Sequence, residues 1–278
     1  MRNVLTSRRA RLYVLGAVFA AGFVTIALSP RISLGATYHY FVDQRTILGI
    51  PNALDVLSNL LFLIAGLLGI RLLLLRTGKQ RFQSKWERLP YFVFFFGVAL
   101  TGLGSAYYHL APDNQRLIWD LLPMTLSFGS LVAATIMERV STRAGLVLLI
   151  PFVCLSAASV LYWYQGEMQG HGDYRFYLFV QFFSAFAIGA TVLLFPSRYT
   201  GAGYLGTAFA LYVLAKLFEA FDGPIYSFGH IVSGHTLKHI TAGVACYWIV
   251  RMLQFRHSIQ FDALNVQAPD HVLDSVAR

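Results

Sequence analysis

Eight apolar runs divide the chain, and each is long enough to cross the hydrocarbon core of a membrane. A transmembrane helix needs roughly 20 mostly apolar residues to span about 30 Å. Runs of this length satisfy their own backbone hydrogen bonds in lipid by forming helices. We therefore expect an all-α, polytopic membrane protein whose helices lie at about residues 12–29, 54–75, 90–109, 115–137, 144–164, 174–195, 203–221 and 232–254.

The composition agrees with this fold class. Hydrophobic residues make up 56% of the 278 residues and charged residues only 13%, whereas about 25% of the residues in a typical soluble domain are charged. No stretch has the composition of a separate soluble domain. The two cysteines, Cys154 and Cys246, lie in apolar runs without metal-ligand spacing, so they indicate neither a disulfide framework nor a zinc-cysteine site.

The basic residues predict an orientation. The formal net charge is +9; this would suggest nucleic acid for a soluble protein, but the cytoplasmic loops of membrane proteins are also rich in Lys and Arg. With a cytoplasmic N-terminus, the outer segments keep only Arg31, Arg45, Arg116 and Arg175. The asymmetry predicts a multi-pass protein with both termini in the cytoplasm and no nucleic-acid partner. The inner segments then hold Arg2, Arg8, Arg9, Arg11, Arg76, Lys79, Arg81, Lys85, Arg88, Arg139, Arg143, Arg198, Arg251, Arg256 and Arg278.

The two ends of the chain need separate interpretation. The basic start "MRNVLTSRRARL" suits a signal peptide, but the apolar run that follows is longer than usual and "ALSPRISLG" is a poor cleavage site. We therefore expect a retained anchor helix. The final segment, 255–278, is too mixed to span a membrane and is expected to be a cytoplasmic tail, with an interfacial helix as one form that it could take.

Five polar residues lie within or beside the apolar runs. Ser105 and His109 are near the end of the third run, Asp120 is near the start of the fourth, and His235 and His239 are at the start of the eighth. An ionisable side chain in hydrocarbon is costly and indicates a functional site by default. The predicted topology brings all five to a similar depth in the outer leaflet. Side chains four residues apart share a helix face, so each helix presents a polar edge.

These residue types suit a zinc hydrolase. Three histidines with one open position for water are a known arrangement of catalytic zinc, and the oxygen ligands preferred by calcium or magnesium are scarce at this depth. Zinc acidifies its bound water, and Asp120 could relay the proton. Other interpretations stay open. Ser105 could bond to its own helix backbone, Asp120 could cap a helix or pair with Arg116, and the histidines could be interfacial residues without a metal.

The same residues carry a family resemblance. The stretch "GLGSAYYH", an aspartate after ten further residues, "LLPM" and the terminal "HTLKH" together resemble the motifs of the alkaline ceramidases. These enzymes belong to the CREST superfamily of seven-helix membrane hydrolases, which also includes the adiponectin and progestin receptor family. The similarity covers about residues 52–254. It implies a seven-helix catalytic core over 52–254, with 1–51 as an added N-terminal helix and outer segment, and 255–278 as a tail.

The resemblance implies a role for each residue of the site. His109, His235 and His239 correspond to the zinc ligands, Ser105 to the group that steadies the oxyanion or its water, and Asp120 to the acid/base. The implied substrate, and partner, is a membrane lipid: a long-chain amide such as ceramide, cleaved to a sphingoid base and a fatty acid. The active site would open toward the outer side of the membrane.

A calcium site is a further implication of the resemblance. The stretch "NALDVLSNLLF" is similar to the start of the family's first core helix, where an acidic residue helps to hold calcium with an upstream D-W-x-E-like segment. Here "YHYFVDQRTILGIPN" keeps Asp43 but lacks the tryptophan and the glutamate, and Asn52 stands in place of the acidic ligand. Asp43, Asn52 and Asp55 would form a weakened oxygen-ligand site. The alternative is an ordinary capped helix start.

Three charged residues in the last two runs depart from a purely apolar core. Lys238 stands where the family usually has an aromatic residue, and a cation beside His239 disfavours a metal unless it points outward or pairs with an acid. It could instead contact a carboxylate or phosphate of a substrate. Lys216 and Glu219 are three residues apart and are expected to neutralise each other.

Three other functions compete with ceramide hydrolysis. A retinal photoreceptor would use a lysine of the last helix and Asp120 as its counter-ion, but it has no use for three histidines at one depth. A receptor or metal-dependent lipid sensor keeps the fold and the metal without hydrolysis. An esterase or lipase acting on another membrane lipid changes only the bond that is cleaved. Ser105 and Asp120 favour chemistry over sensing, and the motifs leave the acyl donor open.

Overall fold

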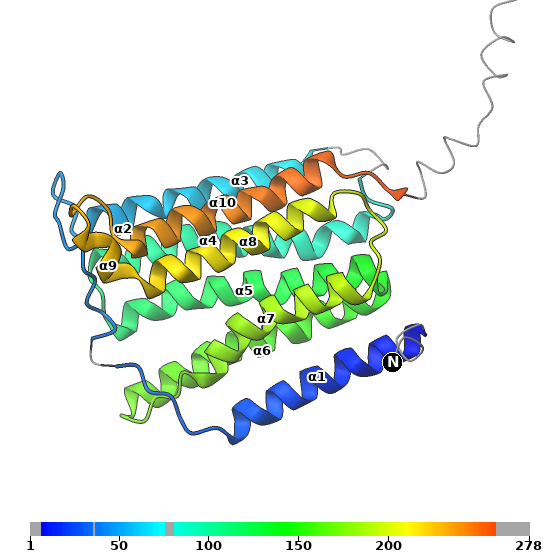
Figure 1. Cartoon of the computed structure of the whole chain (residues 1–278), viewed down its shortest axis with the longest axis horizontal. Coiled ribbons are helices and arrows are strands. Elements are labelled where there is room, and N and C mark those ends of the chain that lie inside the picture. The colour runs from blue at the N-terminus through cyan, green and yellow to red at the C-terminus, as the bar shows by residue number, and fades with distance from the viewer. Residues whose placement is uncertain (1–6, 36, 76–80, 260–278) are drawn as a thin grey trace, which may run out of the picture.

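The computed structural model describes residues 7–35, 37–75 and 81–259, and every regular element within these ranges is helical. The long helices lie roughly parallel in one bundle, as Figure 1 shows. The elements in chain order are α1 (Arg8–Leu28), α2 (Ala53–Ser58), α3 (Leu60–Leu74), the 3-10 helix η2 (Lys85–Glu87), α4 (Arg88–Leu110), α5 (Asn114–Arg139), α6 (Thr142–Met168), α7 (Arg175–Leu194), α8 (Ala202–Ala220), α9 (Asp222–Ser227) and α10 (Gly234–Phe255).

The observed helices confirm the all-α prediction. Every predicted run lies on a helical stretch, but the second is divided at Asn59 between α2 and α3, and the short helix α9 precedes α10. Among the described residues, six stretches are long and apolar enough to cross a membrane: α1, α2 with α3, α4, α5, α6 and α7. Six such helices are typical of a multi-pass membrane protein. Helices α8 and α10 carry the charged residues and the histidines noted above. That these two helices also cross the membrane stays a prediction.

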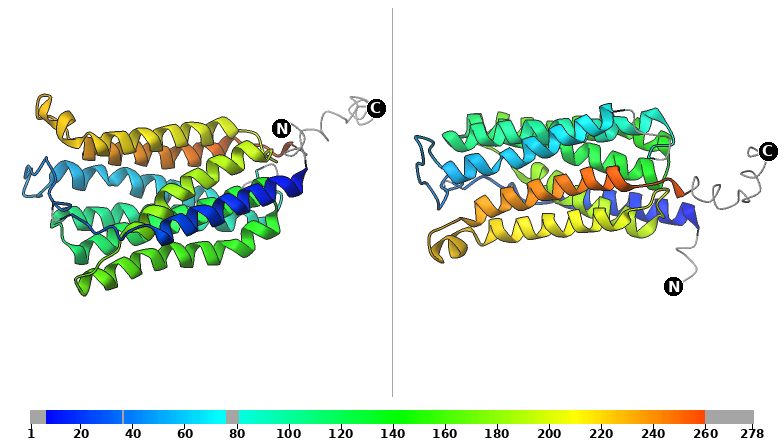
Figure 2. Two further views of the ribbon diagram at one scale, coloured as in Figure 1. Left: turned by 60° about the horizontal axis from the view of Figure 1, so that its bottom comes forward. Right: turned by 90° about the horizontal axis from the view of Figure 1, so that it is seen from above.

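Helix α1 lies on the outside of the bundle that the other helices form. Figures 1 and 2 show it at the edge of the molecule, and most of its contacts are with α7. The ring of Phe19 lies 6.3 Å from that of Phe179 and 5.0 Å from that of Phe183, while no residue of α1 is buried. Helices α4, α5 and α10 have large buried faces instead, so the functional residues lie in the part of the bundle that does not include α1.

The end of the bundle where α1 begins and α10 ends gathers basic residues (Figure 1). Arg11 donates to the carbonyl of Leu194, and Arg139 donates to that of Phe195. Arg256, one of the predicted cytoplasmic cations, is 1% exposed and pairs with Glu138 of α5. This ion pair fixes the end of α10 to α5. Most of the predicted tail, 260–278, lies outside the described residues.

Two glycines bring together the helices that carry the candidate site. A Cβ atom on Gly104 of α4 would lie 1.9 Å from the carbonyl oxygen of Trp119 on α5. That carbonyl has no helical N–H partner, because Pro123, four residues later, lacks one. A Cβ atom on Gly234 would lie 2.2 Å from the carbonyl oxygen of Phe218, where α10 starts against α8. Only glycine permits either approach without movement of the backbone.

Replacing Gly104 with alanine should therefore destabilise the protein. The added methyl group meets backbone rather than a flexible side chain, so we expect Gly104→Ala to lower the free energy of unfolding by about 3 kcal/mol, the upper part of the range for overpacking. Gly206→Ala on α8 is the matched control, because nothing lies within 4 Å of its added Cβ. Thermal unfolding in detergent measures both. Equal stability of the two variants would contradict the close packing of α4 on α5.

Candidate metal centre

Three histidine side chains meet at the end of the bundle opposite to Arg256. His109 is in the last turn of α4, and His235 and His239 are in the first two turns of α10. One ring nitrogen of each lies within 4.8 Å of those of the other two, and the Nε2 atoms of His109 and His235 are 3.3 Å apart. His109 is fully buried and His239 is 3% exposed. The structure thus brings the three predicted ligands together as a possible metal site.

The orientation of His239 is set by the short helix α2. Its Nδ1 donates to the backbone carbonyl of Asp55 at 3.2 Å and lies 3.0 Å from the hydroxyl of Ser58. This leaves Nε2 as the free ring nitrogen. A histidine that ligates a metal usually binds a carbonyl or carboxylate with its other nitrogen, so this geometry is typical of a ligand.

The side chain of Asp55 also holds the first turn of α10. Its Oδ1 accepts from the hydroxyl of Thr236 at 2.6 Å. Ser233 caps the same turn by accepting from the backbone N–H of Thr236 at 3.0 Å. Asp55 is 1% exposed, so its Oδ1 depends on the hydroxyl of Thr236 in place of water, while its Oδ2 has no hydrogen-bond partner among the described residues. A polar contact with α2 therefore fixes the turn from which both α10 histidines project.

The other two histidines have separate backbone anchors. The N–H of His235 donates to Oδ1 of Asp222 on α9 at 2.7 Å. The carbonyl of His109 accepts from Nδ2 of Asn52 at 2.8 Å. Asn52 lies at the start of α2 in a left-handed conformation with φ of 46°, and it makes no side-chain cap on that helix. Its amide group therefore supports a histidine of the site rather than capping α2.

The three residues of the predicted calcium site have other partners in this structure. Both carboxylate oxygens of Asp43 accept from Arg45 at 2.7 Å, and this arginine holds the pKa of the Asp43 carboxyl below its usual value. Asn52 uses its amide nitrogen on His109, and Oδ1 of Asp55 serves α10. A calcium site at these residues stays a prediction that the geometry does not favour.

Ser105 and Asp120 lie together beside the histidines. Ser105 is one turn before His109 on α4 and is 2% exposed, and its hydroxyl lies near the carboxylate of Asp120 on α5. The close contact at Gly104 brings these two helices together at this point. Arg116, the alternative partner of Asp120, pairs with Asp113 instead, at 3.8 Å. The structure thus joins the predicted serine and aspartate as a pair.

Lys238 pairs with an acidic residue. Pairing with an acid is one of the two arrangements, with an outward-pointing side chain as the other, that would allow a metal beside it. Its Nζ lies 3.1 Å from Oε1 of Glu219, and Lys216 pairs with the other oxygen of that carboxylate, as expected. The same Nζ lies 3.0 Å from Nε2 of His235. The ammonium group therefore reaches the edge of the histidine cluster instead of pointing away from it.

Phe41 covers the site, a contact that the sequence alone did not predict. Its ring lies 4.5 Å from the ring of His109 and 4.6 Å from that of His235, and it is 7% exposed. Nearby, His39 binds the hydroxyl of Tyr108 and the side chain of Asn114, each at 2.9 Å. The segment between α1 and α2 thus folds over the histidines. The only sequence signal is its aromatic content, "YHYF", which does not specify a contact partner.

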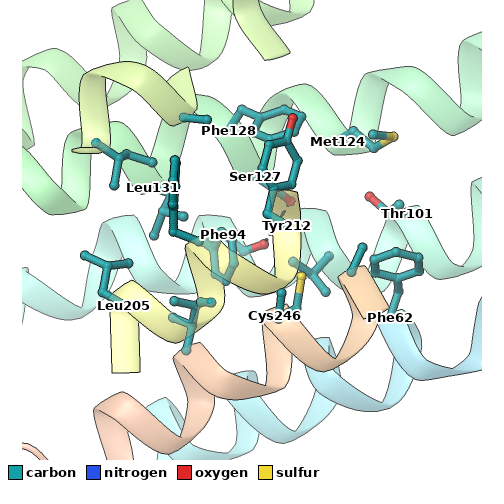
Figure 3. Close-up of a pocket in the computed structure, with 18 residues that line it drawn as sticks. Phe62, Phe94, Thr101, Met124, Ser127, Phe128, Leu131, Leu205, Tyr212 and Cys246 are labelled. Atoms are coloured by element: carbon teal, nitrogen blue, oxygen red, sulfur yellow. Dashed lines mark hydrogen bonds between the residues drawn. The ribbon is translucent and has the colours of Figure 1, made fainter. Parts of the chain in front are cut away.

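An apolar cavity of about 160 Å³ lies in the bundle next to the site, and Figure 3 shows side chains from several helices pointing into it. Thr101 and Ala242 are among the lining residues. They lie one turn from Ser105 and His239 respectively, so the cavity begins about one helical turn from the site along α4 and α10. Phe62, Met124 and Cys246 also line it. An engineered apolar cavity of about 150 Å³ admits benzene, so this one can hold a short piece of hydrocarbon.

Comparison of the chain with family models, curated proteins and solved structures found no match. The site must therefore be judged on its own donors. Three imidazoles with a supported tautomer at His239 suit zinc better than calcium or magnesium, which take oxygen ligands. The identity of the metal belongs to the proposal below.

Thr236→Val tests the contact that orients the first turn of α10. The variant leaves Asp55 buried without its closest donor, so we expect the free energy of unfolding to fall by about 1–3 kcal/mol. Retention of metal during dialysis should weaken as well, since the turn that carries two ligands loosens. Thr207→Val is the control, because that exposed hydroxyl bonds only to its own helix, at the carbonyl of Gly203. Unfolding and metal retention unchanged in Thr236→Val would contradict this role.

Proposed function

We propose that the chain is a zinc-dependent membrane hydrolase that cleaves the amide bond of a ceramide-like lipid. The observation that carries the proposal is the convergence of His109, His235 and His239, with Ser105 one turn from His109 and Asp120 near Ser105. A purely structural metal needs neither a serine nor an aspartate at its edge. The same residues carry the resemblance to the alkaline ceramidases, so chemistry and motif point to one class.

A zinc ion bound by three imidazoles would polarise the amide carbonyl and acidify a water. Asp120 has the chemistry to accept the proton of the attacking water and to return it to the leaving nitrogen. The hydroxyl of Ser105 orients this carboxylate, which assigns Ser105 a positioning role beside the expected stabilisation of the oxyanion. The water oxygen bonds to the acyl carbon, the C–N bond breaks, and the products are a sphingoid base and a fatty acid.

A lipid substrate is supported by the surroundings of the site. The cavity that begins about one helical turn from Ser105 and His239 is lined almost entirely by apolar side chains (Figure 3). A hydrocarbon chain gains about 0.8 kcal/mol for each methylene group that leaves water. The acyl chain of a lipid could therefore enter the cavity while its amide meets the histidines. Phe41, over two of the rings, would limit access of bulk water to the reacting bond.

Asp120→Asn is the direct test of the proposed acid/base. The amide is nearly the same size but cannot accept a proton, so we expect hydrolysis to fall roughly a hundredfold to ten-thousandfold while metal content is unchanged. Asp113→Asn on the same helix is the matched control, because asparagine replaces aspartate well as a helix cap. Fatty-acid release is the measurement. Full activity of a folded, metal-loaded Asp120→Asn protein would exclude this mechanism.

A panel of lipids separates amide from ester hydrolysis. The purified protein is given a ceramide and an ester lipid with the same acyl chain, each in mixed micelles, and release of the fatty acid is followed. We expect cleavage of the amide. Cleavage of the ester alone would change the proposal to a membrane esterase or lipase, and stoichiometric metal without cleavage of either lipid would favour a sensor.

A further inference from the structure

Lys238 lies on α10 between two of the histidines, and its ammonium group reaches the edge of their cluster. Nζ is 3.0 Å from Nε2 of His235 and 3.1 Å from Oε1 of Glu219. Glu219 lies on α8, and its other oxygen accepts from Lys216, about one turn earlier on the same helix. We call Lys238, Glu219 and Lys216 the cationic edge, because two ammonium groups share one carboxylate.

The other carboxylates around the start of α10 are engaged by different donors. Asp222 accepts from the backbone N–H of His235 at 2.7 Å. Oδ1 of Asp55 accepts from a threonine hydroxyl of α10 at 2.6 Å, while its Oδ2 is buried without a hydrogen-bond partner in the part of the chain that the structure describes. The carboxylate of Asp120 lies near a serine hydroxyl of α4. A partly buried charge without a full partner is unfavourable. The cationic edge therefore keeps an attraction for a negative group that its single carboxylate does not satisfy.

Exposure distinguishes the cationic edge from the histidines. The side chains of Lys238, Lys216 and Glu219 keep 19%, 26% and 34% of their accessible surface, whereas His109 and His239 are buried. Phe41 covers the rings of His109 and His235 from the side of the segment between α1 and α2. A ligand that approaches along α8 and α10, which lie side by side (Figures 1 and 2), meets the cationic edge before the histidines.

We infer that the cationic edge selects a lipid amide whose polar end carries a negative charge, a carboxylate or a phosphate, next to the bond that the histidine site cleaves. This inference rests on the proposed amide hydrolysis, and it changes the expected substrate from ceramide itself, which is neutral, to a lipid amide with an anionic polar end. Hydrogen bonds between an ammonium group and an anion are roughly twice as strong as neutral ones. Lys238 is the specificity-determining residue, and Glu219 holds it beside the site.

The reaction of such a substrate needs water alone. For an N-acyl amino acid, the water oxygen bonds to the acyl carbon, the C–N bond breaks, and a proton passes to the leaving nitrogen. The products are a fatty acid and the free amino acid. The amino-acid carboxylate, which takes no part in bond breaking, is the group that Lys238 recognises.

The test compares two amides with the same acyl chain, the anionic N-lauroylglycine and the neutral N-lauroylethanolamine, with dodecyl phosphate as the phosphate arm. Calorimetry in detergent measures how tightly each ligand binds to three full-length proteins: the unaltered protein, Lys238→Met and Lys238→Arg. Lys85→Met is the matched control, because Lys85 lies in η2 at the opposite end of the bundle. Elemental analysis of each protein reports its metal content, and cleavage of both amides is followed in parallel.

We expect Lys238→Met to weaken binding of the anionic ligands about tenfold, the loss of one hydrogen bond to a charged group, and to leave N-lauroylethanolamine unchanged. Lys238→Arg should keep the preference, and Lys85→Met should change nothing. If Lys238→Met weakens the binding of only one of the two anionic ligands, that ligand identifies the recognised group as a carboxylate or a phosphate. If Lys238→Met does not fold, Lys238→Gln provides the same comparison.

The inference would be overturned if the ratio of the two affinities, for N-lauroylglycine and for N-lauroylethanolamine, were the same in the unaltered protein and in Lys238→Met or Lys238→Gln. Failure of the proposed function gives a different result. A metal-loaded protein would then cleave neither amide but would still prefer to bind the anionic one. Cleavage of both amides, with no loss for the anionic amide in Lys238→Met, would keep the hydrolase and exclude the selection of an anion.

Discussion

The contact between α2 and the start of α10 is the interaction on which the candidate site depends. Asp55 provides both halves of it: its backbone carbonyl accepts from Nδ1 of His239, and its side chain accepts from the hydroxyl of Thr236. Both groups are buried, so each must be paired within the protein. One residue of a short helix thereby fixes the rotation of α10 and the ring of a histidine at the same time. The positions of His235 and His239 follow from that rotation.

The remaining helices bring the other half of the site to this point by close backbone packing. Gly104 lets α4 approach the free carbonyl of Trp119 on α5, and Gly234 lets α10 approach the end of α8. In a membrane, helices gain little from excluding water, so small residues and polar contacts determine how they associate. The glycines are thus the reason that Ser105 meets Asp120, and that Glu219 on α8 meets Lys238 on α10.

The sequence predicted the helices and the histidine cluster because both depend on simple periodicities. Long apolar runs specify helices in lipid, and the spacing of His235 and His239 places them on one face. The break at Asn59 was missed because apolarity continues through it. The burial of Arg256 was missed because its partner, Glu138, lies on another helix, and the positions of Phe41 and Lys238 likewise depend on contacts far along the chain. Such pairings are properties of the packed bundle.

The central claim is that the three histidines hold a metal, and the most direct measurement is the metal content of the purified chain in detergent. The double variant His235→Ala/His239→Ala is compared with the unaltered protein and with His257→Ala, a histidine at the opposite end of the bundle. The account predicts stoichiometric zinc in the unaltered protein and in His257→Ala, and its loss in the double variant. A folded, unaltered protein that holds no metal, even after incubation with zinc, would contradict it.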